Sequence, residues 1–173
     1  ALELAMTVYG GSFTSRLVQN LREEKGYTYS PGAGASWMAG RGSVRTFAAV
    51  RNEVTGAALN EILYEMARMT TTEPTDEEME RAFRKDAGSL AVALQTASGV
   101  AEEVARFWVL GLAPGEIGRI VPGLAKVSKA RVRRAARRVF GTGAARIVAV
   151  GDAAAIREEL AAFGEVVEAA PEG

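Results

Sequence analysis

Residues 27–51 alternate small, β-branched or aromatic side chains with polar ones, and the alternation is interrupted once, at 39–42, by Ala-Gly-Arg-Gly. A two-residue period is typical of a β-strand with one buried face, and a glycine-containing break between two such runs indicates a β-hairpin. We therefore predict antiparallel strands at 27–38 and 43–51. Both runs are rich in glycine and alanine, which favour strands less than β-branched residues do.

Helical periodicity dominates the rest of the chain. Apolar spacing predicts a first helix over 1–9 and a second that Ser12 caps and that ends at Lys25, with Gly26 as the residue after the helix. The remaining predicted helices begin at Asn52 or Thr55, follow a capping box of Thr75 and Glu78 as far as Ser98-Gly99, and cover 100–110 and 153–163. A short helical piece at 117–127 is predicted to break at Pro122-Gly123, and Ser128 is predicted to cap a helix over 129–140.

Two short segments near the C-terminal end have the composition of strands. Residues 145–150, Ala-Arg-Ile-Val-Ala-Val, predict a buried strand, and residues 165–168 predict a last short one. Helices thus come in runs around a hairpin and do not alternate with single strands. This order indicates an α+β fold, a two-layer sandwich in which helices pack on a mainly antiparallel sheet.

The length and composition suit one domain with a substantial core. The chain has 173 residues, 48% of them hydrophobic, and its 21 basic and 21 acidic residues give a net charge of 0. These values are typical of a globular domain, so we expect residues 1–173 to form a single one. Residues 1–6 read like the middle of an amphipathic helix, and we therefore expect this domain to be a fragment of a longer polypeptide.

The chain contains no histidine and no cysteine. Without cysteine it has no disulfide, thiolate nucleophile or cysteine-ligated zinc. Without histidine it has no Ser-His-Asp relay and no histidine-ligated zinc. We therefore expect no hydrolytic activity from this chain alone, and we predict neither catalytic residues nor a metal site in it.

The segment from Gly10 to Ser30 holds the candidate binding residues. Its glycine pair follows a helix and lacks the spacing of a phosphate-binding loop, so it indicates a tight turn. Arg22, near the end of the second predicted helix, and Tyr29, at the start of the predicted strand, can converge across the turn at Gly26. Such a pair can donate hydrogen bonds and stabilise negative charge. The alternative is a surface ion pair for Arg22 and a place at the edge of the core for Tyr29.

The order of residues in this segment resembles that of a known family. Residues 10–30, Gly-Gly-Ser-Phe-Thr-Ser-Arg-Leu-Val-Gln-Asn-Leu-Arg-Glu-Glu-Lys-Gly-Tyr-Thr-Tyr-Ser, are similar to the Gly-Gly-x-x-Ser-Arg-Leu-x-x-x-Leu-Arg-Glu-x-x-Gly-x-x-Tyr-Ser segment of the M16 zinc metallopeptidases, the family of pitrilysin and mitochondrial processing peptidase. Residues 74–82, 126–132 and 147–152 resemble three further stretches of that family, in the same order. The resemblance spans nearly the whole chain and points to the family's C-terminal, inactive domain.

The resemblance implies an M16-type metallohydrolase domain that faces a catalytic partner. In the family, zinc is bound by a His-x-x-Glu-His helix of another domain, and this chain lacks that motif. The resemblance implies that Arg22 and Tyr29, seven residues apart, bind peptide across the chamber from the zinc, whereas Tyr27 lacks this spacing. The implied partners are an M16 domain or subunit with His-x-x-Glu-His, in the same chain or a heterodimer, and a peptide substrate. A non-proteolytic scaffold subunit of the same fold is the alternative.

Other charged clusters have simpler interpretations. Residues 76–78, Asp-Glu-Glu, begin a helix, where acids stabilise the helix dipole, and Glu102-Glu103 fit a solvated helix face, so neither pattern favours a metal site. The basic stretch 126–138 could bind nucleic acid or anionic lipid. A solvated face paired with acids is favoured, and we expect no nucleic-acid partner. Trp37, in the hairpin, could form a platform for a ligand.

No apolar run approaches the length of a membrane-spanning helix, so we expect no membrane span. No secretory signal is visible. The compartment is left open between the bacterial periplasm or cell envelope and the cytoplasm.

Overall fold

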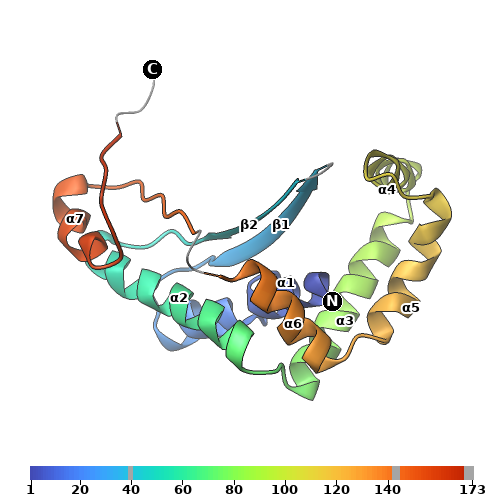
Figure 1. Cartoon of the computed structure of the whole chain (residues 1–173), viewed down its shortest axis with the longest axis horizontal. Coiled ribbons are helices and arrows are strands. Elements are labelled where there is room, and N and C mark those ends of the chain that lie inside the picture. The colour runs from blue at the N-terminus through green and yellow to red at the C-terminus, as the bar shows by residue number, and fades with distance from the viewer. Residues whose placement is uncertain (39–40, 142–144, 170–173) are drawn as a thin grey trace.

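The computed structural model describes residues 1–38, 41–141 and 145–169, in which helices cover one face of a small sheet (Figure 1). Strands β1 (Gly32–Met38) and β2 (Arg41–Phe47) pair antiparallel, with Gly32 opposite Phe47. The α-helices are α1 (Leu2–Tyr9), α2 (Thr55–Thr71), α3 (Asp76–Ala93), α4 (Ala97–Val109), α5 (Ile120–Ala125), α6 (Lys129–Val139) and α7 (Ala153–Ala161). The other helical turns are η1 (Val18–Glu24), η2 (Asn52–Val54) and η3 (Pro114–Arg119).

Helix α1 lies at the centre of the core. Residues 4–9 are all buried, and a helix that is enclosed all round must be surrounded by other elements. The residues that complete the core come from η1 and the residue before it, from α2 and α3, and from α6 and the residue after it. They are Leu17, Leu21, Ala58, Met69, Ala82, Val132, Ala136 and Phe140. The polar residue Thr7 donates a hydrogen bond to Asp86 Oδ1 at 2.7 Å, which satisfies its hydroxyl inside the core. The predicted helix at 1–9 is confirmed, but it is not amphipathic.

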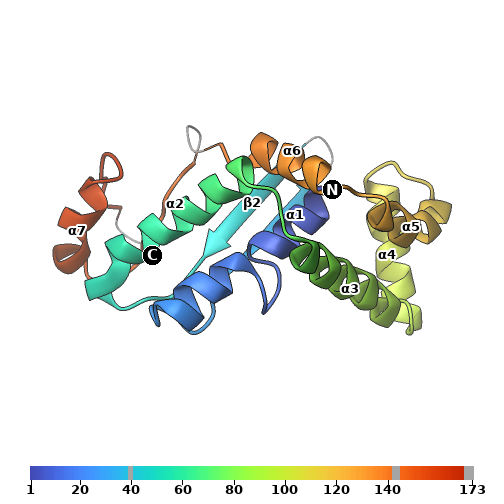
Figure 2. The ribbon, with the colours of Figure 1, turned by 90° about the horizontal axis from the view of Figure 1, so that it is seen from below.

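The sheet presents one face to the helices and leaves the other open. Ala33, Ala35 and Val44 pack against the core, whereas Gly34 and Arg45 are exposed on the opposite face. Figures 1 and 2 show α1, α2 and α6 on the same side of the sheet, with α7 at one end of the molecule and α4 and α5 at the other. Within the described residues no helix combines the length and the apolar character needed to cross a membrane.

The predicted helix starts at Thr75 and Ser128 are confirmed. The predicted break at Pro122-Gly123 is wrong, since Pro122 lies in the first turn of α5, where proline is tolerated. Thr75 Oγ1 accepts a hydrogen bond from the Glu78 N–H at 3.1 Å, and the Glu78 carboxylate accepts one from the Thr75 N–H at 2.8 Å. Ser128 Oγ accepts from the Arg131 N–H at 3.3 Å. The break predicted near Ser98-Gly99 comes slightly earlier, because Thr96 caps α4 by accepting from the Gly99 N–H at 3.1 Å.

The hairpin and the fold class are confirmed in a coarser form than predicted. The strands are shorter than 27–38 and 43–51, and the turn predicted at 39–42 lies partly outside the described residues, since 39–40 are not described and 41–42 belong to β2. The described chain is a mixed, mostly helical fold with a small two-stranded antiparallel sheet.

The strand predictions for residues 145–150 and 165–168 are wrong for this structure. Neither segment belongs to a strand, and Val148 and Val150 are 87% and 97% exposed. A strand needs a neighbour that takes up its backbone N–H and C=O groups. Among the described residues β1 and β2 pair only with each other, so the apolar composition of 145–150 finds no partner strand.

Candidate functional site

Arg22 and Tyr29 lie on either side of a sharp turn. Arg22 belongs to the last part of η1, a π-helical turn, and π-helical turns are frequent at functional sites. Gly26 has a φ of +62°, and the Tyr27 N–H bonds to the Leu21 carbonyl at 2.8 Å, so the chain leaves the helix in a glycine-dependent C-terminal cap, as predicted. Tyr29 then lies in the loop before β1 and not inside the strand as predicted.

The turn brings the two side chains into contact. The guanidinium carbon of Arg22 lies 4.6 Å from the centre of the Tyr29 ring, within the range of a cation–π interaction. The ring of Phe13 lies 4.4 Å from the same carbon. Tyr29 is 78% and Phe13 67% exposed, whereas Arg22 is only 24% exposed. The cation is therefore more enclosed than the rings beside it.

A helix capped by Ser12, as predicted, would include Phe13 in its first turn, and that predicted start of the helix is wrong. The Gly10 N–H bonds to the Met6 carbonyl at 2.9 Å. Ser12 Oγ donates to the Thr7 carbonyl at 3.2 Å and does not cap the next helix. The chain thus makes a turn before the helix begins, and Phe13 is exposed on that turn. The sequence does hold one sign of this turn, the pair Gly10-Gly11. A turn that extends past the two glycines starts the helix later and leaves Phe13 outside it.

Arg22, Tyr29 and Phe13 border an open cleft of about 370 Å³ with mainly apolar walls. Phe47 of β2 lies over Gly32 of β1, where a Cβ atom would come within 2.7 Å of the ring. Glycine is needed there because it lets the ring pack against the backbone. The other lining residues are Gly10, Gly11, Ser12, Val18, Ser30, Pro31 and Ala33. The side chain of Trp37, the possible platform, lies outside the described residues.

This arrangement can donate hydrogen bonds. A guanidinium is a donor only, and a phenol hydroxyl can donate as well as accept. Within the described residues the side chain of Arg22 makes no hydrogen bond, and its ion-pair partner Glu23, 3.3 Å from Nε, is half exposed. The described part of the chain also has no group of three or more potential metal ligands. The site therefore suits the binding of a carbonyl or carboxylate oxygen.

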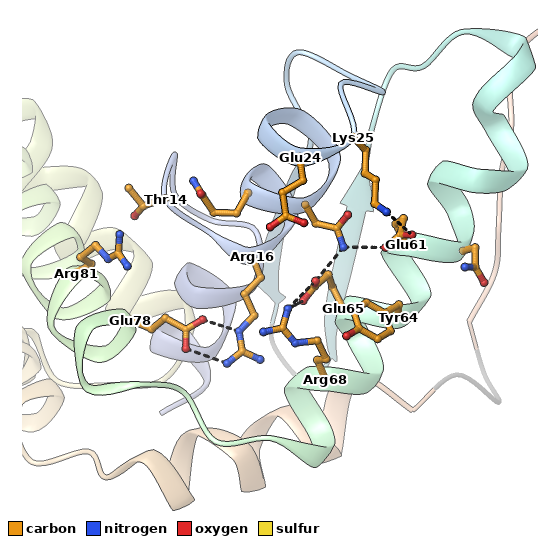
Figure 3. Close-up of a pocket in the computed structure, with 13 residues that line it drawn as sticks. Thr14, Arg16, Glu24, Lys25, Glu61, Tyr64, Glu65, Arg68, Glu78 and Arg81 are labelled. Carbon is orange, nitrogen blue, oxygen red and sulfur yellow. Dashed lines mark hydrogen bonds and ion pairs between the residues drawn. The ribbon is translucent and has the colours of Figure 1, made fainter.

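Arg16 has a structural role that contrasts with that of Arg22. It is 5% exposed, and its Nε and Nη2 donate to the two carboxylate oxygens of Glu78 at 2.7 and 2.9 Å (Figure 3). Burial of this carboxylate raises its pKa, but the hydrogen bonds from Arg16 and the Thr75 N–H, with the nearby positive charges, outweigh that effect. The pKa of Glu78 is therefore lowered from its ordinary value. Arg16 thus joins the turn before η1 to the start of α3.

A larger cleft of about 600 Å³ contains many charges, but they bind one another (Figure 3). Asn20 Nδ2 donates to Glu61 at 2.8 Å and to Glu65 at 3.0 Å. Arg68 Nη1 donates to Glu65 at 2.9 Å. Because most of the charges in the larger cleft are paired with one another, we place the candidate site at the smaller cleft, where the Arg22 guanidinium makes no hydrogen bond within the described residues.

The sequence of this region matches a described family. Residues 1–85 match the family model of the peptidase M16 inactive domain. Residues 1–85 therefore belong to the M16 inactive-domain family. The matched region of this M16 domain holds Phe13, Arg22, Tyr29 and the pair of Arg16 and Glu78, so the resemblance carried by the 10–30 segment is confirmed. No curated protein matches the chain.

Three crystal structures share the fold of this chain. A peptidase M16 inactive domain from Pseudomonas fluorescens has a TM-score of 0.73 at 22% identity, over 80% of this chain and 33% of that one. A protease from Helicobacter pylori has a TM-score of 0.70 at 16% identity, over 81% and 34%. A conserved protein from Enterococcus faecalis V583 has a TM-score of 0.67 at 18% identity, over 79% and 32%. At such identities the likeness shows the fold alone, and the chain spans about a third of the length of each.

The basic stretch at residues 126–138 is partly paired with acids of the loop before α3 and of the first residue of α3. Lys129 Nζ lies 2.7 Å from Asp76 Oδ1, and Arg133 Nη2 lies 3.4 Å from Glu73 Oε1. These ion pairs agree with the interpretation of α6 as a solvated face matched by acids.

Proposed function

We propose that this M16 inactive domain forms the non-catalytic side of a peptide-binding chamber, where Arg22 and Tyr29 bind the substrate backbone. The observation that carries the proposal is the Arg22 guanidinium, held against two aromatic rings at an open apolar cleft and making no hydrogen bond within the described residues. A peptide carbonyl is the complementary acceptor. Apolar walls lower the local dielectric, and a hydrogen bond to a cation is stronger there than in water.

The proposal assigns hydrolysis to another domain. Zinc peptidase chemistry of this family type needs imidazole ligands, and the sequence contains no histidine. The expected partner is an M16 domain or subunit that bears His-x-x-Glu-His and binds zinc, in the same polypeptide or as a heterodimer. Zinc bound in that partner would supply the Lewis acid that activates water and polarises a scissile carbonyl. Arg22 and Tyr29 would stabilise the peptide carbonyl and the negative charge that develops on its oxygen, without changing protonation state.

The two-layer sandwich belongs to the same proposal. Strands β1 and β2 alone make a narrow sheet, and residues 145–150 have the composition of a strand without a strand partner in the described part of the chain. Strands supplied by a partner domain would pair with the edges of this sheet and widen it under the helices that already cover one of its faces.

A scaffold subunit without proteolytic function is the second candidate, and one surface favours it. Trp108 and Val109 at the end of α4, and Leu112 just after it, are exposed. Grouped exposed apolar side chains mark contacts with other proteins. This surface would serve an assembly role whether or not a peptide binds at Arg22.

The test replaces Arg22 by Ala and Tyr29 by Phe in the complete two-part peptidase. Because a hydrogen bond from a charged donor contributes about 1.5–3 kcal/mol, we expect Arg22→Ala to lower kcat/KM by roughly 10- to 100-fold. Tyr29→Phe removes one neutral donor, worth about 1 kcal/mol, and should cost about fivefold. The matched control is Arg51→Ala, which removes an exposed arginine whose nearest carboxylate, that of Glu53, is 4.0 Å away.

Circular dichroism and unfolding curves of the same variants establish that the fold is retained. Unaltered turnover in Arg22→Ala and Tyr29→Phe would contradict the peptide-binding role. A complete protein that lacks His-x-x-Glu-His in every subunit would favour the scaffold function.

A further inference from the structure

We propose that Phe13 is a positioning residue, whose ring holds the Arg22 guanidinium at the cleft and leaves its N–H donors available to a peptide. This inference rests on the proposed function. The ring lies 4.4 Å from the guanidinium carbon, slightly closer than the ring of Tyr29. Phe13 precedes η1 and Arg22 lies near its end, so the contact joins the two ends of this helical turn.

Phe13 does not belong to the core. Its ring is 67% exposed and is not part of the buried cluster around α1. The ring lines the cleft, where its face contacts the cation of Arg22. Packing of the core therefore does not account for an aromatic residue at this position.

The backbone that carries Phe13 is fixed to α1. The N–H groups of Gly10 and Gly11 both bond to the Met6 carbonyl, at 2.9 and 2.8 Å, and the Ser15 N–H bonds to the Ser12 carbonyl at 3.1 Å. A Cβ on Gly11 would lie 3.1 Å from the Met6 oxygen, so glycine permits this close approach. An anchored turn can restrict where the flexible arginine side chain lies.

An aromatic ring positions an arginine differently from a carboxylate. Arg16 is held by Glu78, and two of its nitrogens are used in doing so. A ring instead contacts the face of the planar guanidinium, while the N–H groups point outward in the plane. Phe13 therefore fixes the cation without using the donors that a peptide carbonyl needs.

The test measures peptide binding to the 173-residue chain by NMR titration with N-acetyl-trialanine N-methylamide, which has small side chains and offers mainly backbone groups. We expect Phe13→Leu, which keeps the apolar bulk but removes the aromatic face, to weaken binding about three- to tenfold, the range of a cation–π contact. Phe13→Tyr restores a ring and should stay within about twofold of the original chain. The matched control is Tyr64→Leu, since Tyr64 is an exposed aromatic beside another arginine, 5.8 Å from the guanidinium carbon of Arg68.

A second measurement reads the contact without any peptide. The Arg22 Nε–H signal in the NMR spectrum is shifted by neighbouring rings, so Phe13→Leu should move it and Phe13→Tyr should restore it. An Arg22 signal that does not respond to Phe13→Leu overturns the inference. Phe13→Met replaces Phe13→Leu if circular dichroism shows that the leucine variant is unfolded.

A double variant separates positioning from direct contact. In the Arg22→Gln background Phe13→Leu should cause no further loss of affinity, because the ring acts through Arg22. An equal loss in both backgrounds shows that the ring touches the peptide itself and overturns the positioning role. Unchanged binding in Phe13→Leu, with a loss in Arg22→Gln, overturns this inference alone. Unchanged binding in Arg22→Gln overturns the proposed function and the role of Phe13 with it.

Discussion

Glu78→Gln tests whether one carboxylate joins the candidate-site segment to the rest of the domain. Glu78 accepts two hydrogen bonds from Arg16 at 2.7 and 2.9 Å and one from the Thr75 N–H at 2.8 Å. Glutamine keeps an amide oxygen for one of these donors but removes the charge and the second acceptor. Arg16, which is 5% exposed, then remains in the interior without its counter-charge.

The size of the effect follows from this burial. Breaking a fully buried ion pair from one side costs about 3–5 kcal/mol, because the remaining charge is uncompensated. The Glu78 side chain is 18% exposed and glutamine retains one acceptor, so we expect a loss near the lower end, about 2–3 kcal/mol at pH 7. Glu77→Gln on the same helix is the matched control. Its partner Arg81 is 3.2 Å away and both side chains are exposed, so it should cost about 0.5 kcal/mol or less.

The pH dependence provides an independent check. The pKa of Glu78 is lowered in the folded state, so its ionised form is stabilised by folding and the unfolded chain binds the proton more tightly. This contribution is fully present above the unfolded pKa, about 4.3, and is lost as the pH falls through the folded value. The free-energy difference between the original chain and Glu78→Gln should therefore shrink below about pH 4.

Urea unfolding followed by circular dichroism at pH 7 and at several values down to pH 3 measures these differences. Glu78→Gln should unfold at a clearly lower urea concentration than Glu77→Gln at pH 7, and the two should converge in acid. Equal stabilities of the two variants at pH 7, or a gap that does not change with pH, would refute the reasoning.

Two further substitutions test the packing. Gly10→Ala would place a Cβ 2.7 Å from Ala33 Cβ, and we expect this crowding to destabilise the fold by about 1–3 kcal/mol in thermal unfolding. The control is Gly34→Ala, whose Cβ enters open space and should change the stability by less than about 0.5 kcal/mol. Equal effects of the two variants would contradict the close approach of the turn and β1. Val148→Lys should also cost less than about 0.5 kcal/mol, because Val148 is 87% exposed, and a loss of several kcal/mol would show that 145–150 is a buried strand after all.

Local chemistry explains which parts of the fold the sequence predicts well. A helix that begins at Thr75 needs a hydroxyl and a carboxylate three residues apart, and the structure shows both of their hydrogen bonds. A helix that ends before Gly26 needs a residue able to adopt a positive φ, and the structure has φ +62° there. Both signals depend on residues that are close together in the sequence, so every group that makes the interaction can be read from the same short segment.

Residues 145–150 show why a strand is harder to predict. Their β-branched composition favours a pleated, half-buried strand. A strand forms, however, only where another strand supplies hydrogen-bond partners for its backbone N–H and C=O groups. Such partners come from distant parts of a polypeptide, and within the described residues β1 and β2 are the only strands. Composition alone therefore does not decide whether this segment is paired.

The candidate site was predictable in part for the same reason. The turn at Gly26 is local, and it implies that Arg22 and Tyr29 approach each other. The contact of Phe13 with Arg22 depends on where the helix begins after the glycine pair. When a turn precedes the helix, the helical spacing of an apolar residue wrongly predicts that this residue lies in the helix.

The two arginines of the segment 10–30 show the same difference between contacts with sequence neighbours and contacts with distant residues. Arg16 and Arg22 are six residues apart, in one stretch that matches the M16 family. Arg16 meets a carboxylate from α3, which lies 62 residues further along the chain, and its charge is used in holding the domain together. Arg22 contacts rings from the turn before η1 and the loop before β1, and its Nε lies 3.3 Å from the half-exposed carboxylate of Glu23. A buried carboxylate from a distant helix ties Arg16 into the fold, whereas rings and an exposed neighbouring carboxylate leave the Nη donors of Arg22 to a ligand, and only the tertiary structure separates the two roles.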